Sequence, residues 1–205
     1  MKKLILSIAV LAGLGVSAQA QTEKGKIILG GSVAYQSEKS DANGANAAES
    51  FNILPSVGYF VADNIAIGTG IGYNYSNVGA ASTTGQREEF LVSPFGRYYT
   101  ALGEKFKFFG QLQVPLAFGN VKATDASGDA GSKTGTSTSI GVALSPGFAY
   151  FPTKKIGIEF ALNGISYNNY RVEDANGNEL KGAGSDSFAI GTNFFAPRIG
   201  IQFHF

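Results

Sequence analysis

The residues that could do chemistry in this sequence are a few charged side chains set among alternating apolar and small residues. Arg97, Glu159 and Arg198 each fall on the polar phase of a segment whose other phase is apolar. Glu89 and Lys107 do the same. A charge taken out of water is costly unless it is paired and hydrogen-bonded. We therefore expect Arg97, Glu159 and Arg198 to form one charge network, with Glu159 and Arg198 as the nearest pair and Arg97 joining across an enclosed interior.

Such a network has two possible uses. Fully paired charges would plug the interior, whereas partly free charges would form a selective constriction or gate. Many inward positions hold glycine, which would leave the interior open unless Leu54, Phe95 and Phe109 fill it together with the charged group. Both uses stay open at this point.

Residues for catalysis or metal binding are scarce. His204 is the only histidine, so a Ser-His-Asp site would have to use a residue next to the C-terminus. Its position between Phe203 and Phe205 favours packing at a rim. The stretch 174–179 resembles a calcium loop, but its glycine comes two positions early, and Asn176-Gly177 is typical of a hairpin turn. We therefore expect no catalytic residues, no metal site and no cofactor.

The elements that must position these residues are strands, and the C-terminal one shows this clearly. The segment from Phe195 to Phe205 alternates between an apolar face and a polar or small face, and it ends on an aromatic residue. A period of two indicates a strand with one apolar face. A soluble sheet would seldom display such a face at a chain end, where fraying is common. Lipid explains the apolar face better.

The same alternation recurs along the chain. It is cleanest from Ile65 to Ser76, where Ile and Tyr on one face oppose Gly, Ala and Asn on the other. Small residues on one face suit the inside of a narrow barrel of about eight strands. The sequence predicts these strands: Lys26–Gln36, Ser50–Phe60, Ile65–Ser76, Glu89–Tyr99, Phe106–Gly119, Ser139–Phe151, a strand from Ile156 with a bulge after Gly164, and Phe195–Phe205.

The connections alternate between short turns and long polar loops. Membrane barrels have such alternation, with short turns on the periplasmic side and long loops outside. We therefore predict an all-β fold, an eight-stranded antiparallel up-and-down transmembrane β-barrel. Every second predicted strand carries one proline on its apolar face, which we attribute to local bulges: Pro55, Pro94, Pro146 and Pro197. Adjacent aromatics before the short turns are predicted to form a periplasmic girdle: Tyr59, Phe60, Tyr98, Tyr99, Tyr150 and Phe151.

The N-terminus indicates export. Met1 to Ala20 has two lysines, an apolar run and an A-x-A site before Gln21, which is the pattern of a secretory signal peptide. We expect residues 1–20 to be the signal peptide and residues 21–205 to be one barrel domain. Without Lys2 and Lys3 the chain has 14 basic and 15 acidic residues, so it lacks the strong positive charge of a nucleic-acid binder. The sequence has no cysteine, which excludes a disulfide scaffold and a lipoprotein anchor.

With these features in view, the chain resembles the small outer-membrane β-barrels of the OmpA/OmpX type, and most of all the OmpX-like versions common in Bacteroidetes. The stretch from Gly58 to Gly68, the proline-bearing strands and the terminal Phe carry the resemblance. Gly200, Phe203 and Phe205 resemble the C-terminal signal that the barrel assembly machinery recognises. The resemblance implies the cell outer membrane as the location, with outer-membrane lipid, lipopolysaccharide and the assembly machinery as partners.

Barrels of this size host unrelated roles, so the expected fold does not fix the activity. The first hypothesis is a non-enzymatic protein with a structural or envelope-interaction role, which presents four extracellular loops. The second is a narrow pore or conduit for small or hydrophobic solutes. Asp125 and Asp129 could bridge lipopolysaccharide through a divalent ion, although a flexible polar loop explains them as well. A closed barrel has no free edge, so we expect a monomer.

Overall fold

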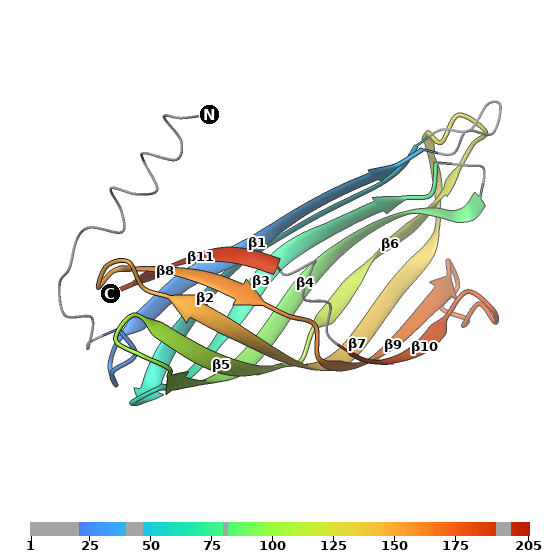
Figure 1. Cartoon of the computed structure of the whole chain (residues 1–205). Helices are drawn as coiled ribbons and strands as arrows, with labels where there is room; N and C mark the ends of the chain where they lie inside the picture. Colours follow the sequence, from blue (N-terminus) through green and yellow to red (C-terminus); the bar gives the residue numbers. More distant parts are fainter. Residues whose placement is uncertain (1–20, 40–46, 80–81, 192–197) are drawn as a thin grey trace, which may run out of the picture.

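A computed structural model describes residues 21–39, 47–79, 82–191 and 198–205. Its strands belong to one antiparallel sheet that closes on itself (Figure 1). Within the described residues no helix is long and apolar enough to cross a membrane. The strands are β1 (Ile27–Glu38), β2 (Ala48–Ala62), β3 (Ile65–Asn77), β4 (Ser82–Ala101), β5 (Phe106–Gln113), β6 (Leu116–Thr124), β7 (Ala130–Tyr150), β8 (Ile156–Ala161), β9 (Ile165–Asp174), β10 (Ser185–Ile190) and β11 (Arg198–His204).

These strands make eight passages through the barrel wall, because three passages are interrupted. β5 and β6 pair with the same neighbours, β4 and β7, on either side of Val114 and Pro115. β8 and β9 both pair with β7, and β11 and β10 continue the sheet beside them. The pairing of β1 with β11 closes the circle. The predicted eight-stranded antiparallel up-and-down barrel is therefore confirmed.

Side chains alternate across the wall as the sequence predicts. On β3, Ile67 and Ile71 are exposed on the outer surface, whereas Ala66 is completely buried inside. Gly68 also faces inward, and a Cβ there would lie 2.6 Å from the ring of Phe95, so only glycine leaves room for that ring. A continuous apolar outer surface of this size is unusual for a soluble monomer and suits lipid.

The predicted aromatic girdle is half wrong. Tyr59 and Tyr98 are exposed on the outer surface, as a girdle requires. Phe60, Tyr99 and Phe151 instead point into the barrel and are 0–1% exposed. Successive residues of a strand point to opposite faces, so only one member of an adjacent aromatic pair can face lipid. The other member is available to fill the interior.

The strands extend further than the sequence predicts. β4 has 20 residues and β7 has 21, and the predicted loop from 120 to 138 shrinks to the connection between Thr124 and Ala130. The apolar outer band of β4 ends at Phe90, and a surface ion pair between Glu88 and Lys122 lies just beyond it. Runs rich in Ser and Thr can continue a strand when neighbouring strands supply the ladder bonds. The polar strand ends thus project past the apolar band.

The described prolines lie opposite irregular points of the neighbouring strands. The carbonyl of Pro94 accepts from Val114 N–H at 3.0 Å, where β5 gives way to β6. The carbonyl of Pro146 accepts from Leu162 N–H at 2.8 Å, in the break between β8 and β9, where the pairing register of β7 changes. The predicted bulge thus lies just before Ile165. Pro55 pairs with Gly31, whose φ is +151°. Pro197 lies outside the described residues.

The two ends of the barrel differ. The short connections β2–β3, β4–β5 and β7–β8 lie at one end, which we call the turn end, together with Gln21 and Phe205. The opposite end, which we call the loop end, carries the connections β1–β2, β3–β4 and β6–β7 and the hairpin between β9 and β10. Only β1–β2 (39–47) and β9–β10 (175–184) are longer than the connections of the turn end, because β4 and β7 extend into the predicted loops. This placement puts both ends of the predicted mature chain on the same side.

Candidate functional site in the barrel interior

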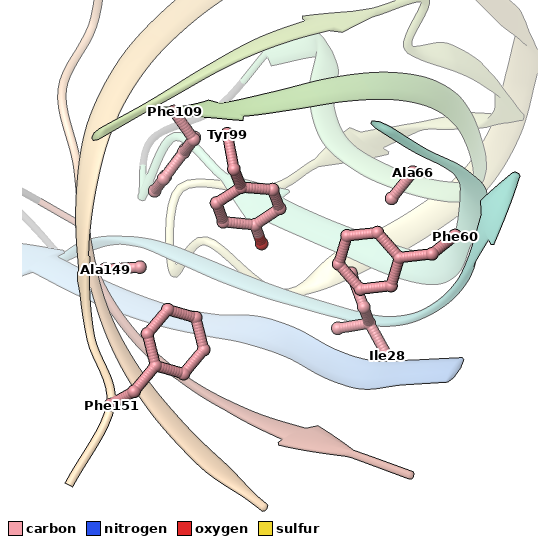
Figure 2. Close-up of a cluster of buried hydrophobic side chains, with 7 residues drawn as sticks. All are labelled: Ile28, Phe60, Ala66, Tyr99, Phe109, Ala149 and Phe151. Carbon is pink, nitrogen blue, oxygen red and sulfur yellow. The ribbon is translucent and has the colours of Figure 1, made fainter. Parts of the chain in front are cut away.

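The turn-end half of the interior is filled by aromatic and apolar side chains (Figure 2). The ring centroids of Tyr99 lie 5.9 Å from Phe60 and 5.7 Å from Phe109, close enough for favourable ring contacts. We call the group the aromatic plug, and its members are Ile28, Phe60, Ala66, Tyr99, Phe109, Ala149 and Phe151. All are 2% exposed or less. They come from β1, β2, β3, β4, β5, β7 and the residue after β7, so the plug draws on most of the wall.

The first residues of the described chain close the mouth below the plug. Gln21 and Thr22 are buried, and Gln21 Nε2 donates to the carbonyl of Thr153 at 2.9 Å. Thr22 Oγ1 donates to Asn64 Oδ1 at 2.6 Å. Lys107 Nζ donates to the same Asn64 oxygen at 3.0 Å, which places this charge at the mouth and apart from the other charges. The polar segment before β1 is thus a structural cap of the turn end.

His204 belongs to this closed end. Its ring packs edge-on against Phe151 at 5.2 Å between centroids, and its Nδ1 lies 2.9 Å from the carbonyl of Gln21. That contact requires a proton on Nδ1, which donates. The described partners of His204 are therefore rings and one backbone carbonyl, and the expected packing role fits this surrounding.

Above the plug lies a buried ion pair between Arg97 and Glu159. Arg97 Nη1 also donates to Tyr99 Oη at 2.9 Å, and its Nε donates to Gln111 Oε1 at 2.8 Å. The guanidinium carbon stands 4.4 Å from the ring centroid of Phe109, a cation–π contact with the plug. We call Arg97, Glu159 and the glutamines that bind them, Gln111 and Gln202, the polar layer.

The glutamate of the polar layer is fully engaged. Glu159 Oε1 accepts from Arg97 and from Tyr99 Oη at 3.2 Å, while Oε2 accepts from Gln202 Nε2 at 2.8 Å. A buried ion pair is tolerated when hydrogen bonds satisfy its remaining lone pairs and protons. The layer therefore holds its charges in place and binds them to four strands: β4, β5, β8 and β11.

Arg198 does not join the pair that the sequence suggests. The expected ion pair between Glu159 and Arg198 is wrong, because Glu159 forms its ion pair with Arg97 and none with Arg198. In the ladder Arg198 pairs with Ala161, which lies two residues further toward the loop end than Glu159. Within the described residues it makes no hydrogen bond or ion pair, and its side chain is exposed. Arg97 and Glu159 thus form the network without it.

Two cavities lie on the loop-end side of the polar layer. The first has a volume of about 110 Å³ and includes Leu54, Phe95 and Gln113 in its lining. The second, of about 530 Å³, lies along the break between β8 and β9 and includes Asn163 and Ile190. Arg198 lines both cavities. Leu54 and Phe95 therefore narrow the interior on the loop-end side without filling it. Phe109 lies in the aromatic plug, where the interior is filled.

A second polar group lies nearer the loop end. Glu89 is buried and accepts from Asn74 Nδ2 at 3.0 Å and from Ser137 Oγ at 2.7 Å. Arg87 stacks on the ring of Tyr170 at 4.8 Å. Among the described residues, no three His, Cys, Asp or Glu side chains come together as metal ligands would. Glu89 is thus held by neutral donors of β3, which is the neighbour of β4, and of β7, which lies beyond β6.

Asp125 and Asp174 in the loops accept hydrogen bonds from backbone N–H groups of their own turns. Asp174 Oδ1 accepts from the backbone N–H of Asn176 at 2.8 Å and of Asn178 at 2.9 Å. The Asn178 N–H bond is the main cause that lowers the pKa of Asp174. Asp125 similarly accepts from the N–H groups of Ser127 and Asp129 at 2.8 and 3.0 Å. The hairpin interpretation of 174–179 therefore fits the contacts that Asp174 makes.

Sequence reasoning missed Tyr99 and Gln202 as partners of the ion pair. Both fall on the inward phase, two residues from Arg97 and from Gly200 respectively, which is the signal that could have found them. Gln111 also falls on the inward phase, but the alternation alone indicates no partner for it. Gly200, Phe203 and Phe205 lie on or just after β11, with both Phe side chains exposed on the outer surface.

Comparison with known proteins gives a family. The family described as "Outer membrane protein beta-barrel domain" matches residues 6–194. Among solved structures, the N-terminal β-barrel domain of OprF from Pseudomonas aeruginosa is similar at 12% identity and a TM-score of 0.48, over 89% of this chain and 98% of that one. Neisserial surface protein A is similar at 14% identity and 0.49, over 88% and 97%. No curated protein matches.

Proposed function

Since the chain belongs to the outer membrane protein beta-barrel family and lies in the outer membrane, we propose that it has a structural role in the envelope and presents four extracellular loops from a plugged barrel. The turn end would face the periplasm and the loop end the outside, as in membrane barrels with short periplasmic turns.

The observation that carries this proposal is the filled turn-end half of the interior. The aromatic plug is nearly inaccessible to solvent, and the polar layer spans the interior directly above it. A pore needs a continuous path of water along the axis. The alternative role as a narrow pore is therefore less well supported, and any conduit for hydrophobic solutes would be limited to the cavities on the loop-end side.

The partners follow from the surfaces. The apolar outer band would contact outer-membrane lipid, and the polar strand ends would reach lipopolysaccharide. Phe203 and Phe205 are both exposed on the outer face of the C-terminal strand, where the barrel assembly machinery would bind them together with Gly200. We propose a monomer without enzymatic activity, because the one histidine packs between rings and the buried carboxylates are held by fixed partners.

The experiment compares envelope integrity in strains of the bacterium that encodes the protein. Uptake of a hydrophobic fluorescent dye should rise when the gene is deleted and return to normal with the wild-type gene. A variant whose β9–β10 connection is cut to a two-residue turn should not restore it. Gly110→Ala, which leaves the loops unchanged and adds a Cβ where nothing lies within 4 Å, should restore it fully. Unchanged uptake after deletion, or full rescue by the shortened variant, would overturn the structural role.

A further inference from the structure

The turn end of the barrel carries more lysines than acidic side chains. Its described segments, residues 21–26, 63–64, 102–107 and 151–155, hold six lysines and three Asp or Glu residues. Lys107 Nζ donates within the mouth, to Asn64. We call the other five lysines the lysine ring: Lys24, Lys26, Lys105, Lys154 and Lys155. Within the part of the chain that the structure describes, none of the five forms an ion pair.

Three lysines of the ring occupy equivalent positions. Lys26, Lys105 and Lys155 come directly before β1, β5 and β8, three of the four strands that lead away from the turn end. Asn64 holds the fourth such position, before β3. Each of the four carbonyls accepts one hydrogen bond from a backbone N–H of the neighbouring strand, and the donors, at 2.8–2.9 Å, are in the same order Phe60, Phe151, His204 and Tyr99. The three lysines therefore lie at one level and are spread around the rim of the barrel (Figure 1).

This level lies just beyond the lipid-facing band. Ile27 and Phe106, which follow two of the lysines, are 42% and 53% exposed on the outer surface. They pair in the ladder with Tyr59 and Tyr150. Aromatic residues of this kind mark the boundary between hydrocarbon and head groups in membrane barrels. The head-group layer is about 5–8 Å thick on each side of the hydrocarbon core. A lysine side chain that starts one residue beyond the boundary can therefore place its ammonium group in that layer.

Anionic lipid is the partner that fits this arrangement best. Lysine near an anionic membrane surface is attracted to the lipid phosphates. Lipids surround a barrel, as the lysine ring does, whereas a partner beneath the barrel would meet the mouth, which Gln21 and Thr22 cap. The loop end differs, because two of its cationic side chains, Lys122 and Arg171, are paired with carboxylates of the protein itself. The unpaired lysines of the turn end leave their charge to the lipid.

We propose that the lysine ring binds the phosphates of anionic phospholipids, so that the barrel holds a shell of these lipids around its turn end. Zwitterionic phospholipids carry a cation beside the phosphate and gain less from the ring. The assignment to the periplasmic leaflet rests on the proposed orientation, in which the turn end faces the periplasm. The preference for anionic lipid itself requires neither that orientation nor the structural role of the loops.

The test measures which lipids contact the purified protein in vesicles of phosphatidylcholine. Electron spin resonance of spin-labelled lipids gives the association constant of phosphatidylglycerol relative to that of phosphatidylcholine. For the wild type this ratio should be at least about threefold at low salt. It should fall to about one in about 1 M salt, where the screening length is about 3 Å. A ratio of one at low salt, or a ratio that salt does not change, would overturn the proposal.

A triple variant locates the effect in the barrel. It replaces the three equivalent lysines by glutamine, and the ratio should fall at least about twofold: Lys26→Gln, Lys105→Gln and Lys155→Gln. The matched control removes the same charge from three exposed lysines near the loop end and should keep the wild-type ratio: Lys39→Gln, Lys133→Gln and Lys181→Gln. Protease resistance in the vesicles verifies that both variants are folded. Equal ratios in the two folded variants would contradict a role of the lysine ring.

A cell-wall partner is tested separately by cosedimentation with purified peptidoglycan in a neutral detergent. The wild type and the turn-end triple variant should sediment equally, because the lysine ring is assigned to lipid. Loss of cosedimentation in that variant, together with an unchanged lipid ratio, would overturn the assignment. Neither measurement depends on dye uptake by cells, so a failure of the structural role and a failure of the lipid preference can be told apart.

Discussion

Arg97 on β4 pairs with Glu159 on β8, 62 residues later in the chain, and the pair spans the barrel interior. It is the only ion pair within the described residues whose two side chains are both less than 10% exposed. Because β4 and β8 are not neighbours in the sheet, the contact crosses the interior instead of running along the wall. It therefore fixes opposite parts of the wall relative to each other.

Breaking this pair should destabilise the barrel strongly. Glu159→Ala leaves the buried guanidinium of Arg97 without its counter-charge, which should cost about 3–5 kcal/mol of unfolding free energy. Removing both side chains should cost less than the two single changes together, because the second change removes the stranded charge. Urea unfolding in lipid vesicles measures all three variants.

The surface pair Glu88–Lys122 is the matched control for this double-mutant cycle, in which the two single variants and the double variant are compared. Its atoms lie 2.6 Å apart, but both side chains are 28% exposed. Its coupling energy should be about 0–1 kcal/mol. A coupling energy for Arg97–Glu159 no larger than that of the control would contradict the role assigned to the buried pair.

Two glycines of adjacent strands should respond oppositely to the same change. A Cβ at Gly147 would lie 2.3 Å from Phe109 in the plug, so Gly147→Ala should cost about 1–3 kcal/mol through overpacking. A Cβ at Gly110 would meet nothing within 4 Å, and Gly110→Ala should be neutral or stabilise by up to about 1 kcal/mol. Unfolding titrations check both, and a neutral Gly147→Ala would mean that the plug is loosely packed.

The barrel could be predicted from the sequence because alternation is a local signal. Every strand carries its own apolar and polar faces, as β3 (Ile65–Asn77) does. The alternation of one strand can therefore be recognised without knowing the strand with which it pairs. Strand ends were less predictable. The Ser and Thr residues of β7 are compatible with loop or strand, and only pairing with β6 and β9 decides between them.

The interior contacts could be predicted only in part. The phase of Arg97, Glu159 and Arg198 was readable, but which of them meet depends on distances across the barrel. Because their predicted strands are neighbours, Glu159 was expected to pair with Arg198. In the structure Glu159 instead pairs with Arg97 across the interior, where Arg97 also donates hydrogen bonds to Tyr99 and Gln111.

Arg198→Gln should leave stability unchanged. The side chain is exposed and has no described charge partner, so its loss should change the unfolding free energy by no more than about 0.5 kcal/mol. Arg97→Gln measured in parallel should be severely destabilised. Equal losses in the two variants would show that Arg198 supports the fold as Arg97 does.

The hairpin that follows β9 should loosen in acid. The pKa of Asp174 is lowered, chiefly by the N–H of Asn178, so the carboxylate stabilises the turn above its unfolded pKa. That contribution is lost as the pH falls through the lower, folded pKa. Cleavage of the 175–184 connection by pepsin should therefore rise over that pH range. Asp174→Asn should show no such pH step, and a step of the same size in that variant would contradict the assignment.

The most direct test of a plugged barrel is single-channel conductance of the purified protein in a planar bilayer. The aromatic plug and the polar layer leave no axial path, so the wild type should insert without steady openings, and Arg198→Ala should be equally silent because Arg198 lies above the plug. Insertion is checked independently by protease protection of the β-barrel in vesicles. Steady, discrete openings of the wild-type protein would contradict the structural role and favour a pore.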